Sequence, residues 1–288
     1  MFCVEVPAST ANLGPGFDTL GLALELTNEV WVEPCEQGLS IQIEGEGAES
    51  LARDEKNLVV RAMRLAFAER RLPGLKLRQV NRIPLSRGLG SSAAAIVGGL
   101  VAAQQLLGRP LPLLELANRM EGHPDNVAPV LSGGLVASGV LEQGPVARQV
   151  PLHECWQLAV AVPPFPLSTE EARRALPPQV SFEDAVFNLS RLALLLSGLS
   201  QGLELDTGDR LHQPYRERLV PGFAAVCAAA RQAGAAGAFL SGAGPTMAAF
   251  VDRRRADAAE VARSMAAAFG EGARGWALEP RLVGARVR

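Results

Sequence analysis

The sequence predicts an α+β protein with two domains, each built around its own hydrophobic core. Apolar and polar residues alternate with the period of two that is typical of strands, both near the start of the chain and again after residue 156. Between these strands, other segments carry apolar residues at helical spacing. The 288 residues are 48% hydrophobic and 20% charged, so the chain can bury enough apolar surface for two layered domains of ordinary size.

The first half of the chain begins with strands. Half-buried antiparallel strands are predicted at residues 2–7, 22–26, 30–32 and 39–43. A helix follows up to residue 67, where apolar residues recur at helical spacing and Asn57 stands in the N-cap position. Residues 75–80 return to strand alternation, and residues 83–90 form a glycine-rich loop. The loop leads into a helix over residues 91–107, whose small residues allow close packing.

A loose connection that contains glycine and proline, near residues 145–151, separates the two predicted domains. We therefore divide the chain into residues 1–152 and 153–288. The strands predicted beyond the connection lie at residues 156–162, 238–241, 247–251 and near Trp276. The helices predicted there lie at residues 169–176, 182–197, 223–232 and 255–269. This mixture of elements fits an α+β sandwich.

The charge balance and the rare residue types exclude several classes of protein. With 28 Lys and Arg against 30 Asp and Glu, the net charge is −2, so the chain lacks the cation excess of a general nucleic-acid binder. Its 4 cysteines and 3 histidines are widely separated, which fits neither a zinc ribbon nor a disulfide scaffold. The chain opens without the basic and apolar regions of a signal peptide. We expect a cytoplasmic protein that contacts no membrane.

The segment from Pro84 to Ala94 has the clearest chemical pattern, because a strand leads into a glycine-rich turn with two serines at the start of a helix. Glycines let backbone amides converge, and a helix N-terminus adds unpaired N–H groups and a partial positive charge. A serine hydroxyl there can also bind Mg²⁺. The segment therefore indicates a phosphate site. From the glycine spacing alone, a tight strand-to-helix crossover with capping serines fits equally well.

Other nucleotide and hydrolase motifs fit this sequence less well. A Walker A motif is excluded because no Gly-Lys-Ser or Gly-Lys-Thr occurs in the chain. Residues 88–93 match a dinucleotide-binding pattern, but two features speak against it. Pro84 is unfavourable in a central parallel strand because proline has no N–H to donate, and no acidic residue ends a second strand about 20 residues later. Residues 198–202 match the serine-hydrolase elbow but end a leucine-rich helix, and residues 270–275 match the dinucleotide pattern but follow a helix instead of a strand. We interpret both matches as coincidental.

Several segments in a fixed order resemble the GHMP small-molecule kinases. Residues 84–94 resemble the phosphate loop of that family. The other segments are most similar to the members that phosphorylate homoserine, and they lie at residues 6–18, 121–129, 168–173, 214–223 and 240–246. The resemblance thus extends over the whole chain, and the ordered set is far more specific than any single motif.

The resemblance implies a fold and a reaction. It implies an N-terminal domain like the second domain of ribosomal protein S5 and a ferredoxin-like C-terminal domain. The reaction implied is transfer of the γ-phosphoryl group of ATP, with Mg²⁺, to the side-chain hydroxyl of L-homoserine. The product would be O-phospho-L-homoserine, on the path to threonine. Members are often dimers, so a homodimer is one assembly that the resemblance allows.

The family motifs also assign roles to individual residues. The ATP-binding positions are Asn57, near the adenine, and the loop residues Pro84, Ser86, Arg87, Gly88, Leu89, Gly90, Ser91, Ser92, Ala93 and Ala94. The Mg²⁺ positions are Ser92 and Glu121. The substrate positions are Asn12, Asp18, His123, Asp125, Thr169, Arg173, Arg216 and Gly242. Arg218 competes with Arg216 for the substrate carboxylate.

The resemblance suggests catalysis by orientation. Some relatives pair a catalytic aspartate with a lysine, but no motif here contains a lysine. We therefore expect Asp125 and Asn126 to position the substrate, with Asn126 near the transferred group, because phosphoryl transfer needs alignment and charge neutralisation more than a strong base. Two alternatives stay open: a GHMP kinase for a neutral or phosphorylated alcohol such as mevalonate or a sugar, and an inactive member that serves as a ligand sensor or interaction protein.

Overall fold

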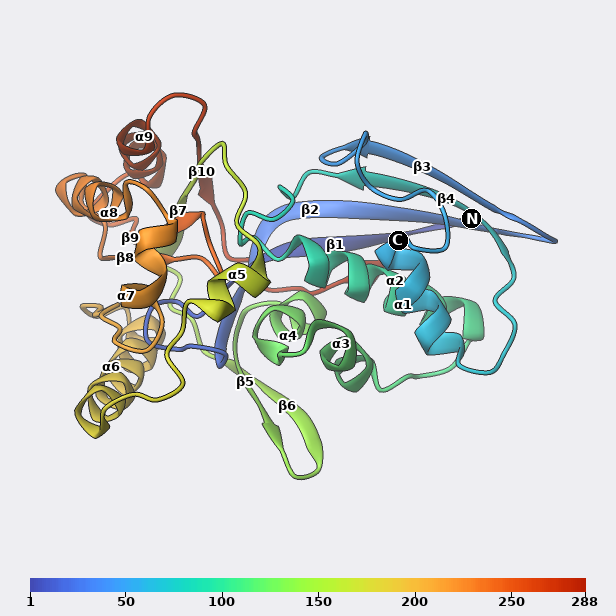
Figure 1. Cartoon of the computed structure of the whole chain (residues 1–288), viewed down its shortest axis with the longest axis horizontal. Coiled ribbons are helices and arrows are strands. Elements are labelled where there is room, and N and C mark those ends of the chain that lie inside the picture. The colour runs from blue at the N-terminus through green and yellow to red at the C-terminus, as the bar shows by residue number, and fades with distance from the viewer.

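Two β-sheets, each with its own helices, make up the molecule (Figure 1). A computed structural model describes residues 1–288 and confirms the predicted α+β class. The larger sheet has 7 strands, with β5 and β6 branching from β2 off the order β11-β1-β2-β4-β3. The smaller sheet has 4 strands in the order β10-β7-β9-β8. No helix is both long enough and apolar enough to cross a membrane.

The larger sheet and its helices are formed mainly by the first half of the chain. The strands are β1 (Phe2–Ala11), β2 (Leu20–Cys35), β3 (Leu39–Gly45), β4 (Gly74–Asn81), β5 (Leu135–Leu141), β6 (Gly144–Val150) and β11 (Arg286–Val287). The helices are α1 (Leu58–Phe67), α2 (Ser91–Leu107), α3 (Leu113–Glu121) and α4 (Pro124–Ser132).

The smaller sheet belongs to the second half. Its strands are β7 (Trp156–Val162), β8 (Gly237–Leu240), β9 (Met247–Asp252) and β10 (Arg274–Leu278). The helices are α5 (Thr169–Arg174), α6 (Phe182–Gln201), α7 (Gln213–Arg216), the short 3₁₀ helix η1 (Glu217–Leu219), α8 (Phe223–Gln232) and α9 (Ala258–Phe269). Helices α8 and α9 lie together at the outer side of this sheet (Figure 1).

Helices α1 and α2 form where the sequence pattern predicts them. The side chain of Asn57 caps α1 by accepting a hydrogen bond of 3.0 Å from the Val59 amide. Small residues let α2 pack closely on both sides, as expected. A Cβ atom at Gly99 would lie 2.4 Å from the Val59 carbonyl oxygen, and one at Gly98 would lie 3.1 Å from methyl groups of Val6 and Val30. Helix α2 therefore fits between the larger sheet and α1, and its start is fixed relative to β1.

Several predicted strands differ from the structure. Residues 22–26 and 30–32 belong to one continuous strand, β2. Strand β1 is buried along almost its whole length rather than half-buried, because other segments cover both ends: Ser9 pairs with Leu89 of the phosphate loop, and Glu5 is covered by Arg281.

Two further predictions are wrong because they depend on pairing partners that periodicity does not reveal. Strand β3 runs parallel to β4, not antiparallel, since the crossover between them contains α1. The predicted loose connection near residues 145–151 is largely strand β6, which forms an antiparallel hairpin with β5. The chain passes to the second half through residues 151–155, after that hairpin.

The last ten residues return to the larger sheet. Strand β11 pairs with β1, with Val287 opposite Val4, and Pro280 forms a bridge to Leu24 of β2. Residues of both halves therefore contribute to this sheet, while the division at residue 152 remains a prediction about domains. The cavity described next lies where the two halves meet.

Candidate active site

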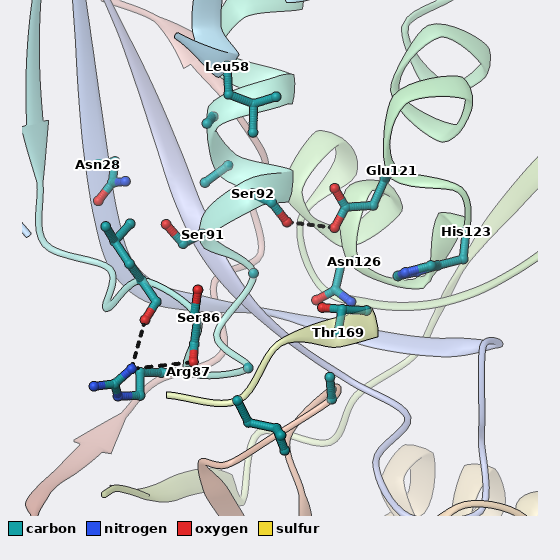
Figure 2. A pocket seen from close by; sticks show the side chains of 18 of the residues that line it. Asn28, Leu58, Ser86, Arg87, Ser91, Ser92, Glu121, His123, Asn126 and Thr169 are labelled. Carbon is teal, nitrogen blue, oxygen red and sulfur yellow. Dashed lines mark hydrogen bonds between the residues drawn. The ribbon is translucent and has the colours of Figure 1, made fainter. Parts of the chain in front are cut away.

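A cavity of about 330 Å³ lies between the two halves of the molecule (Figure 2). Its walls come from the loop between β1 and β2, the start of α1, the loop before α2, the junction of α3 and α4, and α5, α7 and residues 242–244. The volume is typical of a small-molecule site. The eleven predicted site residues that lie outside residues 84–94 all line this cavity.

The glycine-rich loop before α2 turns sharply at left-handed positions. Ser86, Gly88 and Gly90 have φ angles of 52°, 75° and 70°. A Cβ atom at Gly88 would lie 2.2 Å from the Ser241 carbonyl oxygen, so only glycine fits where the loop meets residues 241–244. The loop is thereby held against the second half of the molecule.

Helix α2 begins with backbone amides that have no partner in the protein. Its N-cap residue, Gly90, provides no side chain, and neither serine caps the helix, which contradicts the alternative of a crossover with capping serines. The first helical hydrogen bond runs from the Ala94 amide to the Gly90 carbonyl. The amides of Ser91 and Ser92 therefore stay free, and both residues line the cavity. Such a helix start binds anions.

Not every residue of the predicted phosphate loop reaches the cavity. Seven of the ten do, and Pro84, Leu89 and Ala93 do not; Leu89 and Ala93 are fully buried in the core. Arg87 is a lining residue whose guanidinium donates to the carbonyls of Leu85, Pro163 and Pro164. Burial lowers the pKa of Arg87. These contacts anchor the loop to the segment after β7 and leave little of the guanidinium for a phosphate.

Ser92 and Glu121 meet at the edge of the phosphate loop, as predicted for a metal pair. The Ser92 hydroxyl donates a hydrogen bond of 2.7 Å to Glu121 Oε1 (Figure 2). Burial raises the pKa of Glu121, and the hydrogen bond from Ser92 opposes that rise. A hydroxyl and a carboxylate oxygen are the kind of ligands that Mg²⁺ prefers. The pair therefore fits a divalent cation next to the free amides at the start of α2.

Asp18 and Arg173 form a two-pronged ion pair at the opposite end of the cavity. Arg173 Nη2 lies 2.8 Å from Asp18 Oδ1, and Nη1 lies 3.0 Å from Oδ2. Asn12 holds this arrangement, because its side chain accepts from the Asp18 amide at 2.9 Å and donates to the Gly242 carbonyl at 2.8 Å. Asn12 and Asp18 both adopt positive φ angles. Four predicted substrate residues, far apart in sequence, thus meet at one place.

Asp125 places a second carboxylate near Asp18, and His123 is its partner. His123 Nδ1 lies 2.5 Å from Asp125 Oδ1. Burial alone would lower the pKa of His123, but the hydrogen bond and negative charge of Asp125 outweigh it, so the pKa is raised. One ligand atom each of Asp18, His123 and Asp125 lies within 4.8 Å of the other two. The cluster is suited to a cationic group such as an ammonium.

Arg216 supplies a buried positive charge in the same region. It is only 2% exposed, and it donates to the carbonyls of Ala172 at 3.1 Å and Gly242 at 3.3 Å. Burial and the nearby Arg173 lower the pKa of Arg216 to about 10, so it stays charged near neutral pH. Arg218 is exposed and does not line the cavity. Of the two competing arginines, only Arg216 therefore reaches the site.

Asn126 and Thr169 complete the predicted set. The side chain of Asn126 is buried, and its Oδ1 accepts a hydrogen bond of 2.9 Å from the Ser9 hydroxyl. This contact turns the amide nitrogen away from Ser9, to 3.5 Å from Asp125 Oδ1. Both Asn126 and Thr169 line the cavity, near the space between the phosphate loop and the charged end (Figure 2).

The sequence analysis missed a polar group of lining residues beside Asn57. Asn28, Gln79 and Asn81 project into the cavity from β2 and β4. Gln79 donates to Asn57 Oδ1 at 3.0 Å, while Asn28 Oδ1 accepts from the Ile83 amide at 3.0 Å. Their signal in the sequence is the presence of amides among the apolar residues of two strands, which strand alternation alone attributes to a solvent-facing side.

The comparisons with known proteins agree with this geometry. The family model for the GHMP kinases N terminal domain matches residues 57–134, and the model for the GHMP kinases C terminal domain matches residues 187–271. Together with the cavity, these matches define an ATP-dependent small-molecule kinase of the GHMP class.

Individual relatives narrow the class. The homoserine kinase of Moorella thermoacetica is 49% identical over 276 residues, 92% of each chain, and that of Carboxydothermus hydrogenoformans is 48% identical over 256 residues, 86% of this chain and 84% of its own. The crystal structure of homoserine kinase from Cytophaga hutchinsonii superimposes with a TM-score of 0.89 at 29% identity, over 100% of this chain and 97% of the other. The chain belongs to the homoserine kinases of the GHMP family.

Proposed function

We propose that this protein transfers the γ-phosphoryl group of ATP to the side-chain hydroxyl of L-homoserine, giving O-phospho-L-homoserine for threonine biosynthesis. The observation that carries the proposal is the two-ended cavity: free helix amides at one end, and a buried arginine beside a carboxylate cluster at the other. The names of the similar proteins support the same substrate.

The charged end fits a zwitterionic amino acid better than a neutral alcohol. Asp18 and Asp125 offer oxygens to an ammonium group, while Arg173 and Arg216 offer donors to a carboxylate. In the structure, Asp18 and Arg173 neutralise each other. A zwitterion could take over both partners with its own two charges, so little charge would be left unpaired in a partly buried site. Mevalonate or a sugar has no ammonium group to satisfy the carboxylates.

The nucleotide would lie with its phosphates at the start of α2. The amides of Ser91 and Ser92 provide donors for phosphate oxygens. Asn57 lines the other end of the same wall, next to Gln79, where we propose the adenine. Mg²⁺, held by Ser92 and Glu121, would neutralise charge on the phosphate oxygens.

Catalysis would depend on alignment rather than on a strong base. No lysine lines the cavity, and the Asp125 carboxylate is engaged by His123. Asn126 stands between the two ends, with its orientation set by Ser9. We propose that Asn126 and Asp125 hold the substrate hydroxyl in line with the γ-phosphate, since phosphoryl transfer through a loose transition state gains most of its rate from positioning and charge neutralisation.

The test is ADP release, measured by a coupled assay, with L-homoserine, L-serine, L-threonine and mevalonate as acceptors. We expect kcat/KM for L-homoserine to exceed that for each other acceptor by at least about a hundredfold. A shorter or branched amino acid places its hydroxyl wrongly, and mevalonate, which has no ammonium group, leaves the carboxylates of the site unpaired. Turnover of mevalonate without turnover of homoserine would assign the chain to the alternative GHMP activity. Calorimetry that showed nucleotide binding without any ADP production would favour an inactive sensor.

The proposal extends to the setting of the enzyme. We propose that it acts in the cytoplasm, because its substrates would be ATP and a metabolic intermediate, and that two copies associate. Light scattering on the purified protein measures the mass of the assembly in solution, which should be twice that of one chain.

A further inference from the structure

The side chain of His212 is fully buried next to Arg216, and no role above accounts for it. His212 immediately precedes α7 and has 0% exposure. Its Nε2 lies 2.8 Å from the Gly14 carbonyl oxygen. Because a carbonyl can only accept, Nε2 must carry the proton and donate it. The ring therefore connects α7 to the loop that precedes Asp18.

The other ring nitrogen faces the guanidinium of Arg216. The distance between His212 Nδ1 and Arg216 Nη1 is 3.4 Å. A guanidinium can only donate, so Nδ1 must be the unprotonated acceptor. Both nitrogens are thus assigned by their partners, and the imidazole is neutral. Burial and the charge of Arg216 lower the pKa of His212, which agrees with the neutral form.

Asp209 is the acidic group nearest to this ring, and its carboxylate already accepts hydrogen bonds from other groups. Its carboxylate accepts from the amides of Leu211, His212 and Gln213 and from the side chain of Asn188. Asp209 Oδ2 lies 3.5 Å from His212 Nε2, farther than the Gly14 carbonyl. Asp209 therefore holds the start of α7 in place, while the imidazole proton goes to Gly14.

The contacts of Arg216 leave one side of its guanidinium for a ligand. Nε donates to the Ala172 carbonyl, and Nη1 is shared between His212 and the Gly242 carbonyl. Nη2 makes no hydrogen bond within the protein, and Arg216 lines the cavity. The ring of Phe17 supports both partners: it stacks on His212 with centroids 5.1 Å apart, and the guanidinium lies 5.1 Å from its centroid.

We propose that His212 is a positioning residue, whose neutral imidazole orients Arg216 so that Nη2 receives the carboxylate of the amino-acid substrate. The proposal rests on the proposed function. Through Gly14, the same ring links Arg216 to the loop that carries Asp18. His212 thereby fixes the spacing between Arg216, which donates to the carboxylate, and Asp18, which accepts from the ammonium. This spacing selects for an α-amino acid over compounds that carry only one of the two charges.

Two substitutions separate the two contacts of the ring. In His212→Asn, the amide oxygen takes the place of Nδ1 and can still accept from Arg216. In His212→Gln, the longer side chain places an amide nitrogen near Nε2, so the link to Gly14 is kept and the acceptor for Arg216 is lost. We expect KM for homoserine to rise about tenfold or more in the Gln variant, the usual loss for a hydrogen bond to a charged group. KM for ATP and kcat should change by less than about threefold, and the Asn variant should recover most of the affinity.

His153→Gln is the matched control, because His153 lies at the connection between the two halves and does not line the cavity. Its KM values should equal those of the unmodified enzyme. If the unmodified enzyme does not phosphorylate homoserine, the proposed function fails. If it does, and the Gln variant keeps the same KM for homoserine, or KM for ATP rises as much as KM for homoserine, the role of His212 is refuted.

Nuclear magnetic resonance of the unmodified enzyme, labelled with ¹⁵N at its 3 histidines, tests the same proposal if the variants do not fold. The expected spectrum has a neutral His212 with its proton on Nε2 between pH 6 and 8, and a shift of the Nδ1 resonance when homoserine is added. A charged ring, a proton on Nδ1, or an Nδ1 resonance that does not shift at saturating homoserine would overturn the proposal for His212.

Discussion

The carboxylate of Glu121 faces the cavity and accepts a single hydrogen bond, which the Ser92 hydroxyl donates. Burial raises its pKa, so the charged form is held in the folded protein at a cost in stability. A divalent cation that binds between Glu121 and the phosphates would remove that cost. Without a cation, the Glu121 carboxylate thus makes the fold less stable than a neutral side chain of the same shape would, which is typical of a functional site.

Glu121→Gln tests this opposition. We expect kcat to fall about a hundredfold and the Mg²⁺ concentration for half-maximal rate to rise, because the variant loses an anionic ligand. Urea unfolding without metal should show equal or greater stability than the unmodified protein near pH 8. Since folding raises the pKa of this carboxyl, its unfavourable contribution is present above that raised pKa and vanishes as the pH falls below the ordinary carboxyl pKa.

Glu115→Gln is the matched control for this substitution, because Glu115 is exposed on the same helix, α3. It should change neither the rate nor the metal requirement. An unchanged Mg²⁺ requirement in Glu121→Gln would show that the cation binds elsewhere.

Single residues also show where sequence reasoning ends. Arg218 competes with Arg216 in the sequence because the chain changes from α7 to the 3₁₀ helix η1 between them, and no periodicity predicts which side each faces. The ATP-binding role of Arg87 stays a prediction, and the sequence does not reveal its carbonyl partners at residues 163 and 164, which are distant along the chain. By contrast, Asn12, Asp18, Arg173 and Gly242 were found together because an ordered set of motifs carries information about spatial proximity.

Helices and strands were predictable to the extent that each depends on its own residues. The cap at Asn57 and the small residues of α2 belong to this kind. Pairing is different, because the parallel partner of β3 is chosen by the crossover that contains α1. The loose connection predicted near residues 145–151 is largely strand β6, because the glycine and proline at its start mask the strand pattern.

At the level of elements, Gly99→Ala should destabilise the protein although alanine favours helices. Its Cβ atom would meet the backbone of α1 at 2.4 Å, so the two helices must separate. We expect a loss of about 1–3 kcal/mol in the free energy of unfolding, after the gain of about 1 kcal/mol from helix propensity is included. Gly98→Ala, which meets only methyl groups at 3.1 Å, should cost less. The prediction fails if urea unfolding ranks Gly99→Ala as the more stable of the two.

Ion pairs join the first strand of the molecule to its last ten residues. Arg281, with a side chain 7% exposed, binds Glu5 and Glu25, and Arg286 and Arg288 also contact Glu5. Buried carboxylates are costly when they lose a partner. This closure joins residues that are far apart in sequence, and no local pattern predicts it.

Arg281→Met should therefore destabilise the protein by about 3 kcal/mol, because Glu5 stays buried with fewer donors. Arg286→Met, the control, removes an exposed contact at 3.4 Å and should cost less than about 1 kcal/mol. Chemical unfolding of both variants measures the difference. The double variant Glu5→Met with Arg281→Met should recover part of the loss; if it is less stable than Arg281→Met alone, the unpaired carboxylate is not the cause.

The pairing of β11 with β1 also has a consequence for how the chain is made. During synthesis β1 and β2 emerge early from the ribosome, but the strand that covers the outer edge of β1 emerges only with residues 286–287. Until then that edge offers unpaired amides and carbonyls to other chains. We therefore expect the nascent chain to be prone to aggregation until residues 286–287 have been translated, and chaperones that shield open sheet edges would be of most use to it then.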